Sequence, residues 1–286
     1  MIKTRTPRAG VVGWPVDHSR SPTIHRHWLK ELGLPGSYER FAVRPGEFRP
    51  FAIQIGQNGL VGANVTAPHK EAAYRFCDRR TPIAEALGAV NTLWRQDGLL
   101  WGDNTDVAGF QANMDESAPG WAARAKLAVV IGAGGAARAV IYALKSRGFK
   151  RIAVVNRTRG RAEALAAHFG GLAEAASWAD LRAELREADL LVNTSLLGMA
   201  GQPPLAVDLS PLPDRAVVAD IIYVPLRTPL IEAARARRLR AAEGLGMLLH
   251  QAAPGFARWF GVRPTVTPAL RALVEAEVLA TQVEAQ

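Results

Sequence analysis

The sequence predicts an α/β protein of two domains, the second of which is built on a doubly wound parallel sheet. The chain has 286 residues, which is enough for about two domains of ordinary size. Strand-like apolar runs alternate with helix-like stretches along most of it. An uninterrupted apolar run at residues 127–131 leads directly into a glycine-rich turn at residues 132–137. Together these observations favour an α/β fold over an all-helical or all-strand one.

The first domain is expected to begin with a strand and a helix. Residues 11–13 are strand-like and end before Pro15. Ser21 and Pro22 are typical of a helix start, with a hydroxyl at the N-cap and proline at the first helical position. Gly33 marks the end of the helix.

Further strands of this domain are expected at residues 38–43 and 60–65. Residues 93–94 and 99–101 flank the turn Gln96-Asp97-Gly98, and this arrangement indicates a β-hairpin.

The second domain is expected to span residues 106–240. The run at 127–131 is apolar throughout, as is typical of a parallel strand buried on both faces. The alternation then continues with strands at 152–155, 190–192 and 217–219 and a helix at 160–169. Helical patterns return at 247–260 and from 268 onward. We expect this C-terminal stretch to pack back on the first domain, which then comprises residues 1–105 and 241–286.

Composition excludes several classes of function. The net charge is +9, but the basic residues are scattered and aromatic residues do not interleave with them, so we expect no nucleic-acid binding. No apolar run approaches the roughly 20 residues that span a bilayer. Cys77 is the only cysteine, which fits a reducing, cytoplasmic location. No cysteine or carboxylate cluster completes a metal site around His18, His25 and His27.

The glycine-rich turn predicts a dinucleotide site. Gly132-Ala133-Gly134-Gly135-Ala136-Ala137 matches the G-x-G-x-x-G/A pattern and lies between a strand and a helix, as that pattern requires. Gly132 allows the tight turn, and Gly134 lets the backbone approach a pyrophosphate. Ala137 is small enough for close packing of the helix on the strand.

The residues after the second strand of this domain select the nucleotide. A site for NAD usually carries an acidic residue here, whereas this chain reads Asn156-Arg157-Thr158-Arg159-Gly160-Arg161. Guanidinium groups bind phosphate oxygens with paired hydrogen bonds. The sequence therefore predicts NADP.

Lys70 is the candidate for proton transfer. It ends the stretch Asn64-Val65-Thr66-Ala67-Pro68-His69-Lys70, just after a predicted strand. A lysine can lose its proton near neutral pH when its site perturbs it, whereas an arginine cannot. An acidic partner is available in Asp106.

Ordered motifs over nearly the whole chain resemble the shikimate dehydrogenase family. They are Ser19-Arg20-Ser21-Pro22, the stretch 64–70, Gly88-Ala89-Val90-Asn91-Thr92, Gly102-Asp103-Asn104-Thr105-Asp106, the glycine turn, Asn156-Arg157-Thr158, the stretch 220–225 and Gly246-Met247-Leu248-Leu249-His250-Gln251. The resemblance implies NADPH-dependent, reversible reduction of 3-dehydroshikimate to shikimate, a step in the biosynthesis of aromatic amino acids through chorismate.

The resemblance also implies the roles of individual residues. The catalytic residues would be Lys70 and Asp106. The substrate would be bound by Ser19, Ser21, Thr66, Asn91, Tyr223 and Gln251, and also by Asp106. The cofactor would contact Gly132, Ala133, Gly134, Gly135, Ala136, Asn156, Arg157, Thr158, Arg161, Thr194, Ser195, Met199, Ile221, Gly244 and Met247. Two positions depart from the family pattern: Leu196 replaces a hydroxyl residue, and His69 stands where an aromatic or apolar residue is frequent.

Two other functions remain open at this point. A quinate/shikimate dehydrogenase of the same superfamily would share the fold, although Ser21 and Arg157 favour shikimate and NADP. A non-catalytic NADP-sensing protein would bind the nucleotide but would have no need of Lys70 and Asp106. Family members occur as monomers and homodimers, so either a monomer or a homodimer is expected.

Overall fold

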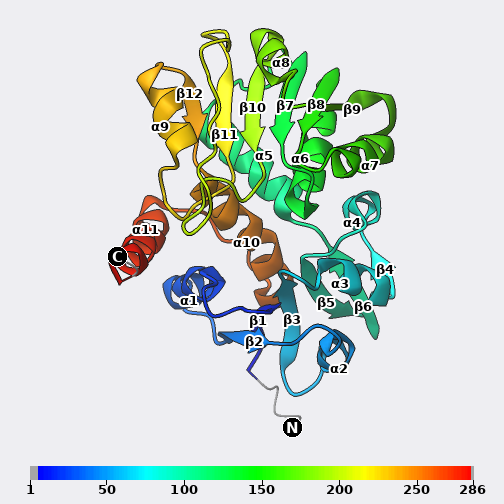
Figure 1. Cartoon of the computed structure of the whole chain (residues 1–286). Coiled ribbons are helices and arrows are strands. Elements are labelled where there is room, and N and C mark those ends of the chain that lie inside the picture. Colours follow the sequence, from blue (N-terminus) through cyan, green and yellow to red (C-terminus); the bar gives the residue numbers. More distant parts are fainter. Residues whose placement is uncertain (1–5, 285–286) are drawn as a thin grey trace. The chain divides into compact units, whose positions relative to one another are not determined.

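The computed structural model describes residues 6–284, which form two compact units (Figure 1). The first unit comprises the chain up to Thr105 together with Gln251–Val274. The second comprises Asp106–His250 together with the residues from Glu275 onward. Helix α10 (Gly244–Phe260) therefore starts in the second unit and ends in the first.

The first unit is built on one mixed sheet. Its elements are β1 (Arg8–Gly13), α1 (Ser21–Glu31), β2 (Ser37–Ala42), α2 (Phe48–Ile53), β3 (Leu60–Val65), α3 (Lys70–Phe76), β4 (Arg79–Arg80), α4 (Pro82–Leu87), β5 (Thr92–Gln96) and β6 (Leu99–Asp103). The strand order is β2-β1-β3-β5-β6-β4. Strand β1 runs parallel to β2 and β3, so the carboxyl ends of these three strands lie at one edge. Strands β5 and β6 are antiparallel, which confirms the predicted hairpin.

Helix α1 begins one residue earlier than its sequence suggests. Arg20 occupies the N-cap and no side chain caps the helix, whereas Ser21 is already helical. The prediction of Ser21 as the capping residue was therefore wrong. Gly33 ends the helix region as expected, with a φ of 60°.

The C-terminal segment completes the core of the first unit. The Trp259 indole Nε1 donates to the carbonyl oxygen of Leu93 at 2.9 Å, and the Trp28 Nε1 donates to that of Thr265 at 3.0 Å. Trp259 also lies directly over Gly62, where an added Cβ would stand 2.0 Å from the indole nitrogen. The sheet and this distant segment are therefore packed as one core.

The second unit carries the parallel sheet. Its elements are α5 (Asp106–Ser117), β7 (Leu127–Ile131), α6 (Gly135–Ser146), β8 (Arg151–Val155), α7 (Arg159–Phe169), the 3-10 turn η1 (Gly170–Leu172), β9 (Ala173–Ala176), α8 (Leu181–Glu187), β10 (Leu190–Asn193), β11 (Val217–Asp220), α9 (Pro229–Ala236), β12 (Arg240–Ala242), the first part of α10 and the end of α11 (Pro268–Glu284). The strand order is β12-β11-β10-β7-β8-β9, and every adjacent pair is parallel (Figure 1).

This order confirms the doubly wound, Rossmann-type sheet that the sequence predicts. Counted from β7, it is the 3-2-1-4-5-6 order of dinucleotide-binding sheets. All residues of β7 are buried, as its continuous apolar run indicates. The strand order reverses between β7 and β10, and ligands of such sheets bind beside the carboxyl ends of the strands at that point.

Two further observations concern what the described chain lacks. Within residues 6–284, no helix is both long and apolar enough to cross a membrane. The same residues hold no group of three or more His, Cys, Asp and Glu side chains suited to a metal ion.

Candidate active site

The glycine turn lies where the strand order reverses. Gly132 has a φ of 109°, and a Cβ on it would stand 2.6 Å from Thr194 Oγ1 and 2.9 Å from the Ser195 backbone nitrogen. The Thr194 hydroxyl donates to the carbonyl oxygen of Ile131 at 2.8 Å. The loops that follow β7 and β10 are thus in direct contact, and only glycine fits between them.

The next two glycines leave space rather than fill it. A Cβ on Gly134 or Gly135 would meet no protein atom within 4 Å. Helix α6 starts at Gly135, so its first backbone N–H groups face this open region. Ala137 is fully buried, as expected for close helix packing. A free helix N-terminus beside open space fits a pyrophosphate group.

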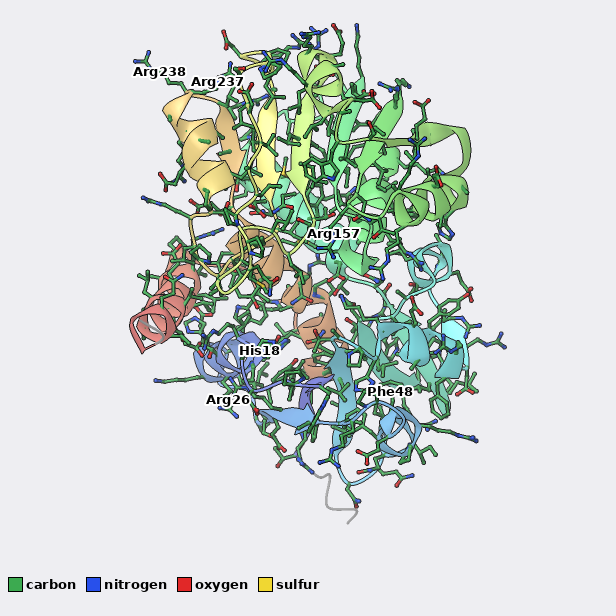
Figure 2. All side chains as sticks on the ribbon, in the orientation of Figure 1. His18, Arg26, Phe48, Arg157, Arg237 and Arg238 are labelled. Atoms are coloured by element: carbon green, nitrogen blue, oxygen red, sulfur yellow. The ribbon has the colours of Figure 1, made fainter. Side chains whose placement is uncertain are left out.

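The arginines after β8 differ in their partners. The Asn156 amide donates to the Thr158 carbonyl oxygen at 2.8 Å and fixes the turn. Arg159 is paired with Glu163 at 2.8 Å. Arg157 (Figure 2) and Arg161 are exposed, and no acidic residue between 6 and 284 lies within ion-pair distance of them. These two guanidinium groups are therefore the ones available to a phosphate.

A second arginine pair belongs to a different part of this unit. Arg237 and Arg238 lie at the end opposite to Arg157 (Figure 2). Arg237 donates to the carbonyl oxygen of Leu212 at 3.1 Å, which is a structural contact.

Asp220 joins the loops that follow β10 and β11. Its carboxylate accepts from the Thr228 hydroxyl at 2.7 Å, the Asn193 amide at 3.0 Å and the Ile222 N–H at 3.1 Å. Burial raises the pKa of Asp220 to about 6, while these three donors act in the opposite direction. The adjacent strand ends are thereby held at a fixed separation.

Several predicted cofactor residues lie on these two loops. A Cβ on Gly244 would stand 2.4 Å from the Ile221 and Ile222 carbonyl oxygens, so the start of α10 touches the loop after β11. The Ser195 hydroxyl donates to Asn193 Oδ1 at 2.7 Å and is engaged within its own loop. Leu196, which departs from the family pattern, is 62% exposed beside it. Met247 is buried in α10, and Met199 lies in the loop after β10, where its N–H donates to Leu196.

In the first unit, Lys70 is the first residue of α3 and is half-buried. Its carbonyl oxygen accepts from the Val90 N–H at 3.0 Å. The Thr66 N–H donates to the Val12 carbonyl oxygen at 2.9 Å, so the loop after β3 is bonded to the end of β1. Backbone hydrogen bonds therefore hold Lys70 beside Val90, the residue before Asn91, and hold Thr66 at the end of β1.

The Asn91 side chain is fixed by a buried polar network. Its Oδ1 accepts from the Thr92 hydroxyl at 2.8 Å, the Thr105 N–H at 2.9 Å and the Thr105 hydroxyl at 3.2 Å. Asn64 donates to the Thr92 hydroxyl at 3.3 Å and accepts from Tyr38 at 2.6 Å. The amide oxygen is thus turned inward, which orients the amide nitrogen as the donor of Asn91.

Sequence reasoning missed the roles of Asn64, Thr92 and Thr105. All three are at most 5% exposed. One signal could have revealed Asn64: it is a polar residue inside an otherwise apolar strand, and a buried amide must find partners.

The two serines occupy the start of α1. The Ser21 N–H donates to Ser19 Oγ at 3.3 Å, and Arg40 donates to the Ser19 carbonyl oxygen at 2.7 Å. Ser21 is buried and is the first residue of the helix.

The remaining predicted substrate residues belong to both units. Asp106 is a buried residue that begins α5 in the second unit, and Tyr223 lies in the loop after β11 of the same unit. Gln251, in α10, belongs to the first unit. The pairing of Lys70 with Asp106 joins residues of different units and stays a prediction.

Two other reactive side chains are buried in the core. Burial raises the pKa of the Cys77 thiol to about 12, so the thiol stays protonated at neutral pH. His25 stacks on Tyr38 with ring centroids 4.0 Å apart, and burial lowers its pKa to about 3. Neither environment resembles that of a nucleophile or a metal ligand.

Comparison with protein families gives three matches in chain order. They are the "shikimate dehydrogenase substrate binding domain" at residues 11–93, "shikimate / quinate 5-dehydrogenase" at residues 117–197 and the "shikimate 5'-dehydrogenase C-terminal domain" at residues 244–274.

Individual proteins agree with these matches. The shikimate dehydrogenase (NADP(+)) of Methylocella silvestris is 59% identical over 97% of this chain and 99% of its own length. Among solved structures, shikimate 5-dehydrogenase from Thermus thermophilus, in complex with NADP(H) and shikimate, is 35% identical with a TM-score of 0.83 over 95% of this chain and 99% of its own. Quinate dehydrogenase from Corynebacterium glutamicum, in complex with NAD, is 30% identical with a TM-score of 0.88 over the same shares, 95% and 99%.

Proposed function

Since the chain belongs to the shikimate dehydrogenase family, we propose how its residues divide the work of that reaction. The reaction is the reversible, NADP-dependent reduction of 3-dehydroshikimate to shikimate in the biosynthesis of aromatic amino acids. The proposed substrate-binding domain comprises residues 1–105 and 241–286, and the proposed NADP-binding domain comprises residues 106–240. In the structure, residues 241–250 and those from Glu275 onward belong to the second unit. The cytoplasmic location and the state of assembly, monomer or homodimer, stay predictions.

The substrate is held by polar side chains, and the orientation of one of them, Asn91, follows from its hydrogen bonds. Ser19 and Ser21 bind its carboxylate. Asn91 donates from its amide nitrogen to a ring hydroxyl, because its amide oxygen is committed to Thr92 and Thr105. Thr66, Tyr223 and Gln251 bind the other hydroxyls.

The cofactor supplies the hydride when it is bound. The N-terminus of α6, with Gly134 and Gly135, would hold its pyrophosphate, and Arg157 and Arg161 would hold its 2′-phosphate. The open space at the two glycines and the unpaired guanidinium groups support this assignment.

Lys70 is the main proton-transfer group. As the ketone is reduced, negative charge develops on its oxygen, and the Lys70 ammonium stabilises that charge and delivers a proton. In oxidation of the alcohol, the neutral amine accepts the same proton. Asp106 orients the ammonium and binds a neighbouring hydroxyl. The observation that supports this assignment is the bond from the N–H of Val90, the residue before Asn91, to the Lys70 carbonyl oxygen.

The test follows NADPH absorbance with purified protein. Shikimate with NADP is compared with shikimate and NAD, and with quinate and each cofactor. Turnover confined to shikimate and NADP supports the proposal. Comparable turnover of quinate, the substrate named for the quinate dehydrogenase neighbour, would favour a quinate/shikimate dehydrogenase. Binding of NADP without turnover of either acid would favour a sensor.

Substitution of the proton-transfer group gives the residue-level test. Lys70→Ala is expected to lower kcat by about 10²–10⁴-fold while the dissociation constant for NADP changes little. Lys30→Ala, an exposed lysine of the same unit, is the matched control. Near-normal turnover of Lys70→Ala would exclude the assignment.

A further inference from the structure

His69, which immediately precedes Lys70, has specific partners in the core of the first unit. The side chain is buried, and its Nε2 lies 2.7 Å from the Val43 carbonyl oxygen. Its ring stacks on that of Phe48, with centroids 5.3 Å apart and planes 25° from parallel. Because a carbonyl oxygen only accepts, Nε2 carries the proton of this hydrogen bond. The imidazole is therefore held at one edge by a bond and at one face by a ring.

The backbone of His69 links a turn to a helix. Its N–H donates to the Thr66 carbonyl oxygen at 3.0 Å, and its own carbonyl oxygen accepts from the Ala73 N–H at 2.8 Å. The residue that accepts the imidazole bond is itself anchored, since the Val43 N–H donates to the Gly13 carbonyl oxygen at 3.1 Å. The imidazole thus ties the loop after β3 to the ends of β1 and β2.

This tie matters because α3 cannot hold its own start in place. The helix has 7 residues, and a helix this short is marginal without tertiary contacts. The Cα atoms of His69 and Lys70 are about 3.8 Å apart, as for any trans peptide, so a displacement of His69 is passed on to Lys70. Proton transfer and hydride transfer require close alignment, and a misplacement of about 1 Å can cost about 10²-fold in rate.

We propose that His69 is a positioning residue for Lys70: its hydrogen bond to Val43 sets where the Lys70 side chain begins. This rests on the proposed role of Lys70 as the proton-transfer group. The contrasting role is that of a core filler, for which any aromatic ring of similar size would serve. The two roles differ in whether the Nε2 hydrogen bond is needed.

Three substitutions separate the hydrogen bond from the ring. His69→Phe keeps an aromatic ring against Phe48 and loses the donor. His69→Gln loses the ring but can place its Nε2 near the position of the imidazole Nε2. His69→Asn is polar but shorter, and its amide corresponds to Nδ1, so it cannot reach the Val43 carbonyl oxygen. His168→Gln, an exposed histidine of the second unit, is the control and is expected to behave as the unsubstituted protein.

We expect kcat to depend on whether the side chain at position 69 can donate a hydrogen bond to the Val43 carbonyl oxygen. His69→Phe and His69→Asn should lower kcat by about tenfold while KM for NADP changes less than about twofold, and His69→Gln should restore most of kcat. With NADPH deuterated at the transferred position, the isotope effect on kcat should rise in the Phe and Asn variants, because the chemical step becomes more limiting. A change in stability alone would leave this isotope effect as it was.

Two results would overturn the proposal. One is wild-type kcat in the Phe and Asn variants; the other is a loss in His69→Gln as large as in His69→Phe. Lys70→Ala is measured beside them. If it turns over normally, the proposed function fails at Lys70, whereas an inactive Lys70→Ala beside a normal His69→Phe refutes only the positioning role.

Discussion

Arg157→Ala is expected to weaken NADP binding selectively, and the structure sets the size of the effect. Arg157 is exposed and has no acidic partner among residues 6–284, so the substitution removes no ion pair of the protein itself. A charge-assisted hydrogen bond contributes about 1.5–3 kcal/mol. Because the guanidinium is open to water, the lower value applies, and about 1.5 kcal/mol corresponds to a roughly tenfold rise in the dissociation constant.

The same loop supplies a matched control. Arg159 is two residues away and is paired with Glu163 at 2.8 Å, so Arg159→Ala is expected to change NADP affinity less than about threefold. Arg157→Ala combined with Arg161→Ala should approach a roughly hundredfold loss if the two contributions add. NAD lacks the 2′-phosphate, so its affinity should stay nearly constant in every variant.

Fluorescence titration with NADPH and NADH, together with KM for NADP and NAD, measures these changes. The reasoning is refuted if NAD affinity falls as much as NADP affinity. It is also refuted if Arg159→Ala is as harmful as Arg157→Ala, since the ion pair with Glu163 would then have no bearing on which arginine binds phosphate.

Two further predictions concern stability. Gly62→Ala places a Cβ 2.0 Å from Trp259 Nε1 and 2.3 Å from the Leu93 carbonyl oxygen, so it should cost about 3 kcal/mol or more by overpacking; an unchanged urea midpoint would contradict this. Asp220 has a pKa raised to about 6 in the folded protein from 3.8, so its contribution to stability falls as pH rises from 4 to 6 and is constant above that. Relative to Asp220→Asn, the unsubstituted protein should therefore lose roughly 3 kcal/mol of unfolding free energy over this window, and a pH-independent difference between the two would refute the burial argument.

Long apolar patterns allowed most of the second unit to be predicted from sequence. The strand expected at residues 127–131 has those bounds as β7, because a strand buried on both faces is apolar at every position. Helices α2 and α3 have only 6 and 7 residues, too few turns for a clear periodicity, and were not anticipated. The two-residue strand β4 leaves no pattern at all.

The candidate site also has a part that could be predicted from the sequence and a part that could not. The glycine turn and the arginines after β8 are local in sequence. As the motif suggests, the turn borders open space and Arg157 and Arg161 are exposed. The network around Asn91 is not local: Asn64 meets Thr92 only because β3 and β5 pair antiparallel in a register that places these two residues opposite each other. Such a register depends on the folded sheet and cannot be deduced from one strand.

The closure of the first unit by Trp259 has a consequence for how the protein is made. Residues up to Thr105 form the sheet, but the indole that covers Gly62 and binds Leu93 lies more than a hundred residues further along the chain. At about 5–20 residues per second, synthesis of the intervening stretch of about 150 residues takes roughly 10–30 s. During that time the emerging N-terminal sheet has an uncovered apolar surface. All strands of the second unit, which end at Ala242, are synthesised before Trp259 can cover that surface. The sheet that is translated first is thus covered only after most of the second unit has been made, and its exposure to chaperones and proteases on the ribosome is set by the length of the stretch inserted between its two parts.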